Sequence, residues 1–450
     1  MMETFSLKKF VYLCTPQVVH SFIKRVEASD IGSRMARGVF WSLSGTVFSR
    51  GLMLCATILV ARILGKTGYG ELGIIQSTVA MFGVFAGFGL GMTATKYVAE
   101  FRRSNPNRAG RVMGIAGLFA VFTGGIMASA LLVFAPWLAE NTINAPHLAG
   151  ALRIGALILF INALNGAQTG ALAGFEAFKT IAKVNFFVGL ASFPILLCGA
   201  LLGGLHGSVW ALAVNLSLNW VLNHLALRRE AHLHHVPFSL KGCTSEWPVL
   251  WRFSLPAAMA SAMVGPANWF CSANLVNQPN GYEEMGIFNA ANQWFTMLMF
   301  LPGLLGSVVL PLLANQIGKK EKLQSKRTLI LAMKTNFLIV APLVLTVGAI
   351  SPFIMTLYGE EFTTGWPTLV VVLINAGILS AQTPVGQIIA ANGKMWIGFI
   401  MNMGWALIFV FTSSFLLDYG SLGLASSRLI AYLFHALWTF GFAINLLMRK

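Results

Sequence analysis

Apolar stretches long enough to cross a membrane recur from one end of this 450-residue chain to the other. A helix crosses the hydrocarbon core of a bilayer in about 20 residues. Only 10% of the residues are charged, whereas soluble domains carry roughly a quarter. Inside lipid a helix satisfies its own backbone hydrogen bonds, and a barrel needs short alternating segments instead. Because the apolar runs here are continuous, the sequence predicts an all-α polytopic membrane protein.

The charged residues order these runs into twelve expected transmembrane helices. Lysine and arginine gather in every second connection and in both tails, and acidic residues dominate the other connections. The positive-inside rule therefore places both termini in the cytoplasm. The formal net charge of +16 indicates nucleic acid only when it forms a basic face on a soluble domain, so we expect no nucleic-acid partner. The expected helices cover about 38–64, 70–96, 112–136, 148–174, 181–204, 206–227, 251–276, 283–313, 328–350, 363–391, 395–416 and 420–447.

Two stretches of the chain repeat each other. GYGELGI at residues 68–74 returns as GYEEMGI at 281–287, an offset of 213 residues (281 − 68). Both copies open an even-numbered helix. Residues 173–185 and 390–402 form a weaker second pair. We therefore expect two parallel six-helix repeats around a central cavity, related by an axis along the membrane normal. The expected parts are a cytoplasmic tail (1–37), an N-terminal lobe (38–227), a cytoplasmic loop (228–250) and a C-terminal lobe (251–447).

The expected helices contain cationic side chains but no central acidic residue that could pair with them. All fifteen acidic residues fall in tails, loops or helix ends. Ionisable groups within a membrane are costly and usually face a cavity or a partner. Uncompensated positive charge there predicts an anionic substrate, and a pyrophosphate suits the guanidinium fork. The four predicted substrate-binding cations are Arg50, Arg153, Lys334 and Arg428.

Arg50 is the most central of these cations. At about 1.5 Å per residue it lies roughly 18–20 Å from either end of its helix, beyond the reach of a snorkelling side chain. Thr46 and Thr57 share its helical face and are predicted to line the cavity. The alternative is a structural hydrogen bond to neighbouring carbonyls. Arg153 and Lys334 lie nearer the ends of their helices, so an interfacial position is the alternative for both.

Polar residues form stripes on two of the expected helices, 420–447 and 283–313. Arg428, Tyr432 and His435 lie on one face, because four and three residues separate them. An interfacial anchor is the alternative for this arginine. Amide side chains bind sugar hydroxyls or join helix to helix, and both roles stay open. The predicted polar lining of the cavity comprises Gln76, Asn289, Asn292, Gln293, Tyr432 and His435, together with the two threonines.

The chain is not expected to be an enzyme. It has no GxxxxGK[ST] for nucleotides, no GxSxG or HExxH, and no paired carboxylates for glycoside chemistry. The five cysteines show no CxxC spacing, so neither a metal nor a disulfide framework is expected. We predict no cofactor.

Three segments resemble a known family. ARILGKTGYGELGIIQS and GFGLGMTATKYVAE resemble the first helical hairpin of polysaccharide-biosynthesis flippases, which belong to the multidrug/oligosaccharidyl-lipid/polysaccharide exporter superfamily. LAGFEAFKTIAKVN resembles the loop between their fourth and fifth helices. The resemblance implies translocation of undecaprenyl-pyrophosphate-linked oligosaccharide across the bacterial inner membrane by alternating access, for O-antigen, capsule or exopolysaccharide assembly. Implied partners are this polyprenyl-pyrophosphate-linked glycan, membrane lipids, a glycan polymerase and glycosyltransferases.

Two other functions stay open at this point. An ion-coupled multidrug antiporter of the same superfamily shares the architecture, but cationic drugs need acidic residues in the cavity, and no expected helix holds a central one. A non-transporting scaffold of a glycan-assembly complex is the second alternative, and a transport assay separates it from a flippase.

Overall fold

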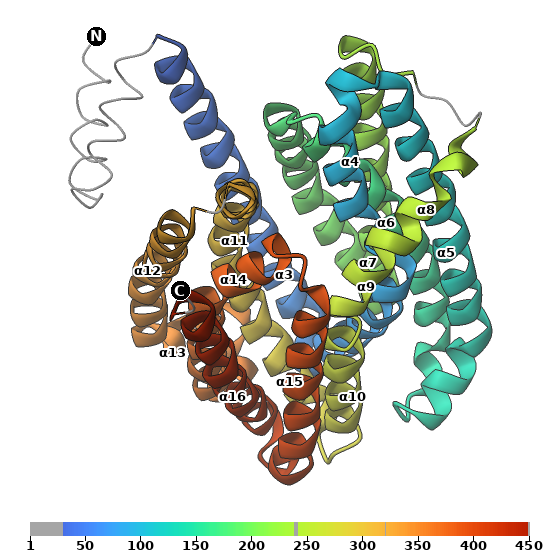
Figure 1. The fold of residues 1–450 in the computed structure, drawn as a ribbon. Coiled ribbons are helices and arrows are strands. Elements are labelled where there is room, and N and C mark those ends of the chain that lie inside the picture. The colour runs from blue at the N-terminus through green and yellow to red at the C-terminus, as the bar shows by residue number, and fades with distance from the viewer. Residues whose placement is uncertain (1–29, 238–241, 320, 449–450) are drawn as a thin grey trace, which may run out of the picture.

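The computed structural model describes residues 30–237, 242–319 and 321–448 (Figure 1). Within these ranges the chain is helical throughout and contains no strand. Seven helical segments of the described chain are long and apolar enough to cross a membrane, and three of them exceed 50 residues. The prediction of an all-helical, multi-span membrane protein is therefore confirmed. Residues 1–29 of the expected tail lie outside the described residues.

The first five long helices pack together as what we call the N-terminal bundle (Figure 1). Two of them are broken by glycine: Gly65 has a φ of 69° and Gly204 a φ of 54°. A side chain is strained at positive φ, so glycine allows the chain to leave the helical path there. The helices are α3 (Asp30–Gly87), α4 (Leu90–Ser104), α5 (Pro106–Asn141), α6 (Ala149–Gly174) and α7 (Phe178–Leu233), with the 3-10 turn η1 (Pro146–Leu148) before α6.

The helices after residue 263 form the C-terminal bundle. Proline stands in the first turn of α13 and α14. The N–H groups of a first turn have no acceptor within the helix, so the lack of an N–H in proline costs no hydrogen bond there. The bundle consists of α10 (Val264–Val276), α11 (Gly281–Gly318), α12 (Lys322–Ala349), α13 (Ser351–Tyr358), η4 (Glu360–Gly365), α14 (Trp366–Ala391), α15 (Met395–Leu416), η5 (Leu417–Tyr419) and α16 (Gly420–Met448).

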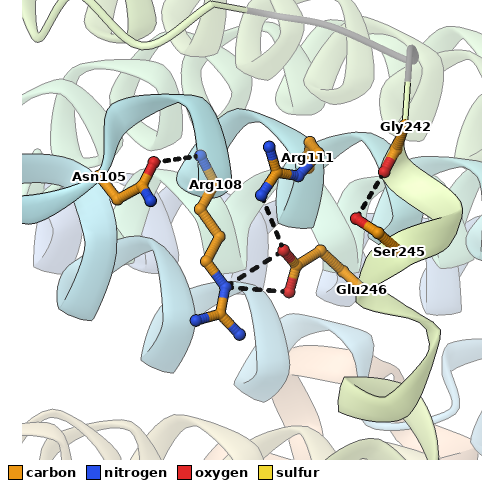
Figure 2. A network of polar contacts seen from close by, with 6 residues as sticks. All are labelled: Asn105, Arg108, Arg111, Gly242, Ser245 and Glu246. Atoms are coloured by element: carbon orange, nitrogen blue, oxygen red, sulfur yellow. Dashed lines mark hydrogen bonds and ion pairs between the residues drawn. The ribbon is translucent and has the colours of Figure 1, made fainter.

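A connector joins the two bundles: its first elements pack on the N-terminal bundle, whereas its last helix packs mainly on α15 of the C-terminal bundle. It comprises η2 (Cys243–Glu246), α8 (Trp247–Val249), η3 (Leu250–Ser254) and α9 (Leu255–Ser261). The buried carboxylate of Glu246 pairs with Nε of Arg108 at 3.1 Å and Nη2 of Arg111 at 3.3 Å, both from α5 (Figure 2). The hydroxyls of Ser254 and Thr93 lie 2.6 Å apart. The first residues expected for the C-terminal lobe thus contact the N-terminal bundle.

The two copies of the repeated heptapeptide pack against each other where the bundles meet. A Cβ on Gly70 would collide with the carbonyl of Tyr282, and one on Gly286 with the carbonyl of Lys66. Only glycine permits this backbone approach. We call this contact, formed by residues 66–74 and 281–289, the seal.

Each copy also sends its tyrosine into the opposite bundle. The ring of Tyr69 lies 6.5 Å from that of Tyr358 and 6.3 Å from that of Phe362, in the C-terminal bundle. The hydroxyl of Tyr282 donates to the carbonyl of Ile143, which follows α5, at 2.6 Å. Lys66 and Glu283 add an ion pair at 2.8 Å. In Figure 1 the bundles approach at the lower end, where α10 ends, and diverge towards the end that carries α4.

Candidate anion-binding site

Arg428 is a buried cation within a segment that can span a membrane. It lies in α16, inside the span Met395–Asn445, and its side chain is 4% exposed. Its Nη1 donates to Oδ1 of Asn292 in α11 across 3.1 Å. The bond joins two helices that the chain places 136 residues apart, so tertiary packing builds this site.

Two aromatic rings of α11 flank the guanidinium. Its central carbon lies 4.6 Å from the ring centroid of Phe295 and 5.2 Å from that of Phe288. A desolvated cation–π contact stabilises by about 2 kcal/mol. Phe288, Asn292 and Phe295 are separated by four and three residues, and this spacing puts them on one face of a helix. That face of α11 therefore both holds the charge and limits its contact with solvent.

Among the described residues, no acidic side chain neutralises the charge of Arg428. Its Nε and Nη2 are buried without a described acceptor. An unpaired buried charge is costly. The site can therefore recover free energy by binding an anion.

The rest of the predicted stripe on α16 makes contacts inside the C-terminal bundle. Nδ1 of His435 lies 2.6 Å from Oε1 of Gln382 in α14, and Nε2 of the same amide donates to the carbonyl of Tyr432 at 3.1 Å. The ring centroid of Tyr432 lies 5.4 Å from that of Trp405 of α15, with the two planes tilted by 33°. These contacts fix the helix that presents Arg428.

Arg50 lies on α3 of the other bundle and is exposed. Its guanidinium sits 4.2 Å from the ring centroid of Phe300 in α11. Arg50 and Arg428 thus approach the same helix from different bundles. Thr57 turns its hydroxyl to the carbonyl of Leu54 at 2.9 Å, and the side chain of Thr46 lies outside the described part of the structure.

The two remaining predicted cations are placed differently. Arg153 on α6 and Lys334 on α12 are exposed, and no described side chain or carbonyl pairs with either of them. Neither is drawn into the cluster around Arg428.

The predicted amides divide between the site and the seal. Asn292 holds Arg428, whereas Nδ2 of Asn289 donates to the carbonyl of Tyr69 at 3.4 Å and its side chain packs on Gly73. Gln76 and Gln293 are half-buried. One short stretch of α11 therefore serves both features.

Sequence reasoning missed three residues of this region, Phe288, Phe295 and Gln382, and it gave Trp405 a role on sugars or at the interface, not this contact with Tyr432. The two phenylalanines share the helical face of Asn292, so helical spacing offers a signal for them once that face is known. Gln382 and Trp405 come from other helices, and their contacts with the stripe depend on how those helices pack.

Comparisons with known proteins agree with this architecture. The curated relatives include the EPS I polysaccharide export inner membrane protein EpsE of Ralstonia solanacearum, 24% identical over 86% of this chain and 88% of the relative. They also include the Lipid III flippase of Escherichia coli K12, 21% identical over 89% of this chain and 95% of the relative.

Among solved structures, an inward-facing multidrug resistance MATE family transporter of the MOP superfamily superposes with a TM-score of 0.70 at 14% identity. The superposition covers 89% of this chain and 96% of the transporter, and it shows that the two share a fold. The signature of the family described as Polysaccharide biosynthesis protein matches residues 35–317, more than half of the chain. The resemblance inferred from the sequence is confirmed: this chain belongs to the polysaccharide biosynthesis protein family.

Proposed function

We propose that this protein is a flippase that moves lipid-linked oligosaccharide units across the bacterial inner membrane by alternating access. The observation that carries the proposal is the buried, uncompensated guanidinium of Arg428 inside a membrane-spanning segment. Such a group favours an anionic passenger. An undecaprenyl-pyrophosphate carrier supplies that charge.

The names of the relatives support the substrate class. One is a polysaccharide export protein of an inner membrane and another is a Lipid III flippase. We propose that the glycan serves O-antigen, capsule or exopolysaccharide assembly, next to a polymerase and glycosyltransferases. The protein itself moves the substrate and catalyses no bond change.

We further propose twelve spans in two parallel repeats. The breaks at Gly65 and Gly204 divide α3 and α7 into two spans each. With α5 and α6 these make six, and α9–α10, α11, α12, α14, α15 and α16 make the other six.

Matching contacts in the two bundles support the repeat. Nδ2 of Asn165 donates to the carbonyl of Leu216 at 3.2 Å, and Nδ2 of Asn375 donates to the carbonyl of Ala425 at 3.1 Å. The offsets between these pairs are 210 (375 − 165) and 209 (425 − 216), close to the 213 of the heptapeptides.

The proposed transport step uses both arginines. The seal closes the periplasmic end, because the lysine- and arginine-rich connections belong in the cytoplasm, which also places both termini there. Arg50 and Arg428 bind the pyrophosphate in a cavity between the bundles. The threonines, amides, Tyr432 and His435 contribute polar lining, and Arg153 and Lys334 attract the headgroup from the interfaces. The polyprenyl tail stays in lipid.

Reconstitution tests this function. Purified protein in liposomes is given a fluorescent polyprenyl-diphosphate oligosaccharide, and the labelled fraction reachable by an impermeant quencher is followed with time. We expect protein-dependent exchange between leaflets. No exchange above protein-free liposomes overturns the proposal and favours a scaffold, whereas export of a cationic drug without glycan exchange favours the multidrug antiporter.

A further inference from the structure

We infer that the surface where the connector packs on α5 binds an anionic phospholipid of the cytoplasmic leaflet. Three arginines hold the lipid phosphate, and two tryptophans lie at the depth of its glycerol esters. We call this surface the connector face; its residues are Arg108, Arg111, Arg252, Trp247 and Trp251. The inference goes beyond the proposed function and takes from it only the orientation, which puts the connector on the cytoplasmic side.

The connector face carries more positive charge than its own acidic residue neutralises. Nε of Arg108 and Nη2 of Arg111 share the one carboxylate of Glu246, at 3.1 and 3.3 Å (Figure 2). Two guanidinium groups and one carboxylate leave one positive charge (2 − 1). Arg252 is exposed and adds another, because no ion pair joins it to an acidic side chain of the described residues. The face therefore attracts an anion.

The two paired arginines keep donors for a second partner. A guanidinium carries five N–H donors, and Glu246 accepts from Nε of Arg108 and Nη2 of Arg111. Nε of Arg111 is buried without a described acceptor. The guanidinium of Arg108 lies 4.2 Å from the ring centroid of Phe101, which attracts the charge and accepts none of its in-plane hydrogen bonds. A phosphate is an acceptor that suits these remaining donors.

Two tryptophans of the connector are exposed beside these arginines. Trp247 is 45% exposed and Trp251 is 55% exposed, and their ring centroids lie 6.3 Å apart. Trp247 also lies edge to face against Phe119 of α5, at 5.8 Å. Exposed indole rings are typical of the membrane interface, where the ring lies among lipid and the N–H reaches the polar groups. The connector face therefore fits the boundary between headgroups and hydrocarbon.

An apolar stripe of α5 continues this face into the hydrocarbon. Arg111, Leu118 and Phe122 share one face of the helix, because seven and four residues separate them. Both apolar side chains are exposed. The eleven residues from Arg111 to Phe122 (122 − 111) rise about 16 Å, which is close to half of the roughly 30 Å hydrocarbon core. A lipid whose phosphate lies at Arg111 can therefore lay an acyl chain along this stripe.

Charge and stripe together select a phospholipid with an anionic headgroup. A soluble phosphate would find the arginines but would gain nothing from the stripe. A zwitterionic lipid matches the stripe, but its ammonium group offsets the charge of its phosphate. The stripe belongs to a helix that can span the membrane, Pro106–Asn141, so a lipid is the neighbour that can follow it along its length.

The test is native mass spectrometry of the full-length protein in detergent, with dioleoyl phosphatidylglycerol and dioleoyl phosphatidylcholine as probes. We expect wild-type protein to bind phosphatidylglycerol about tenfold more tightly. Arg252→Gln and Arg111→Gln each remove one charge, so each should raise the Kd for this lipid about fivefold and change that for phosphatidylcholine less. Arg229→Gln removes an exposed charge of α7. It is the matched control and should bind as wild type does.

Glu246→Gln should strengthen binding. It removes the carboxylate that competes with the lipid phosphate for two arginines, so the Kd for phosphatidylglycerol should fall about fivefold. A contact that only keeps the connector folded predicts the opposite. Trp251→Leu should weaken both lipids alike, because the indole lies below the headgroup that distinguishes them. Melting temperature and elution volume verify that each variant is folded.

Several results would overturn the lipid site. Equal affinity of wild-type protein for the two lipids is one. A preference that survives both Arg252→Gln and Arg111→Gln, or that Arg229→Gln reduces as much, is another. Weaker binding in folded Glu246→Gln excludes direct contact with the phosphate. A dimer that becomes a monomer in Trp251→Leu assigns the face to a second copy of the chain. The proposed function fails separately, when wild-type protein exchanges no lipid-linked glycan between leaflets.

Discussion

Nη1 of Arg428 donates to Oδ1 of Asn292 across 3.1 Å and ties α16 to α11. Arg428 was predicted as a substrate-binding cation and Asn292 as polar lining, on two separate helices. The bond makes them one unit, with the charge held between Phe288 and Phe295. Asn292 therefore positions the guanidinium of Arg428 by accepting its hydrogen bond.

Removing either central arginine should stop transport. We expect Arg50→Ala and Arg428→Ala to abolish surface polysaccharide in the native host while the protein stays in the membrane, because each change removes positive charge from the proposed path of the anion. Immunoblots of membranes and a stain for surface glycan measure the two quantities. Normal polysaccharide in both variants would falsify the proposed roles.

The stacking of Arg50 on Phe300 should contribute less than the charge itself. An exposed cation–π contact is worth about 0.5–1 kcal/mol. Phe300→Leu should therefore lower the exchange rate in liposomes only about two- to fivefold. A loss as complete as that of Arg50→Ala would mean that Phe300 has a role beyond holding this arginine.

A methyl group in the seal should force the bundles apart. Gly286→Ala places a Cβ against the carbonyl of Lys66, and Gly70→Ala places one against that of Tyr282. The backbone carbonyls cannot move aside without a shift of the helices, so the seal should open. To detect this, a cysteine is introduced by Asn289→Cys in a protein whose native cysteines are replaced by alanine. We expect its thiol to react with an impermeant maleimide several-fold faster in the seal variants than in the protein that keeps both glycines. Gly117→Ala, which meets open space in α5, is the matched control. Equal labelling rates in the seal variants and this control count against a closed seal.

Removing the arginines of the connector's ion pairs should destabilise the fold more than removing their shared carboxylate. The carboxylate of Glu246 is 5% exposed, whereas its partners Arg108 and Arg111 are 40% and 32% exposed (Figure 2). Replacing both arginines by alanine leaves a buried charge unpaired, so we expect a loss of about 3 kcal/mol in the free energy of unfolding. Glu246→Gln leaves two solvated arginines and should cost only about 1 kcal/mol. Thermal unfolding in detergent compares them, and an equal loss in the two cases contradicts this reasoning.

The membrane potential should drive the exported anion outward. With the inside negative, each negative charge that crosses gains roughly 2.3 kcal/mol per 100 mV. We expect a potassium-diffusion potential across the liposomes to speed net movement towards the positive side. A rate that responds neither to this potential nor to ion gradients excludes the hypothesis.

The sequence by itself determined the class of this protein. Continuous apolar runs leave helices as the way to satisfy the backbone in lipid, and the repeated heptapeptide predicted two repeats. The repeat gave no indication that its two copies contact each other. The close backbone approach of Gly70 to Tyr282 depends on the relative position of two segments that lie 212 residues apart in sequence (282 − 70).

Tertiary structure decided which of the predicted cations forms a site. Arg50, Arg153, Lys334 and Arg428 are each a charge in an apolar run, and the sequence separated only Arg153 and Lys334, as nearer the helix ends. Packing separates Arg428 from the other three: α11 and α14 cover α16, so Arg428 loses its water and gains Asn292, Phe288 and Phe295, while the other cations stay exposed. Helical spacing determines which residues share a face of one helix. Burial and hydrogen-bond partners depend on the other helices that pack against that face. This packing joins segments far apart in the chain, so no local sequence pattern reveals it.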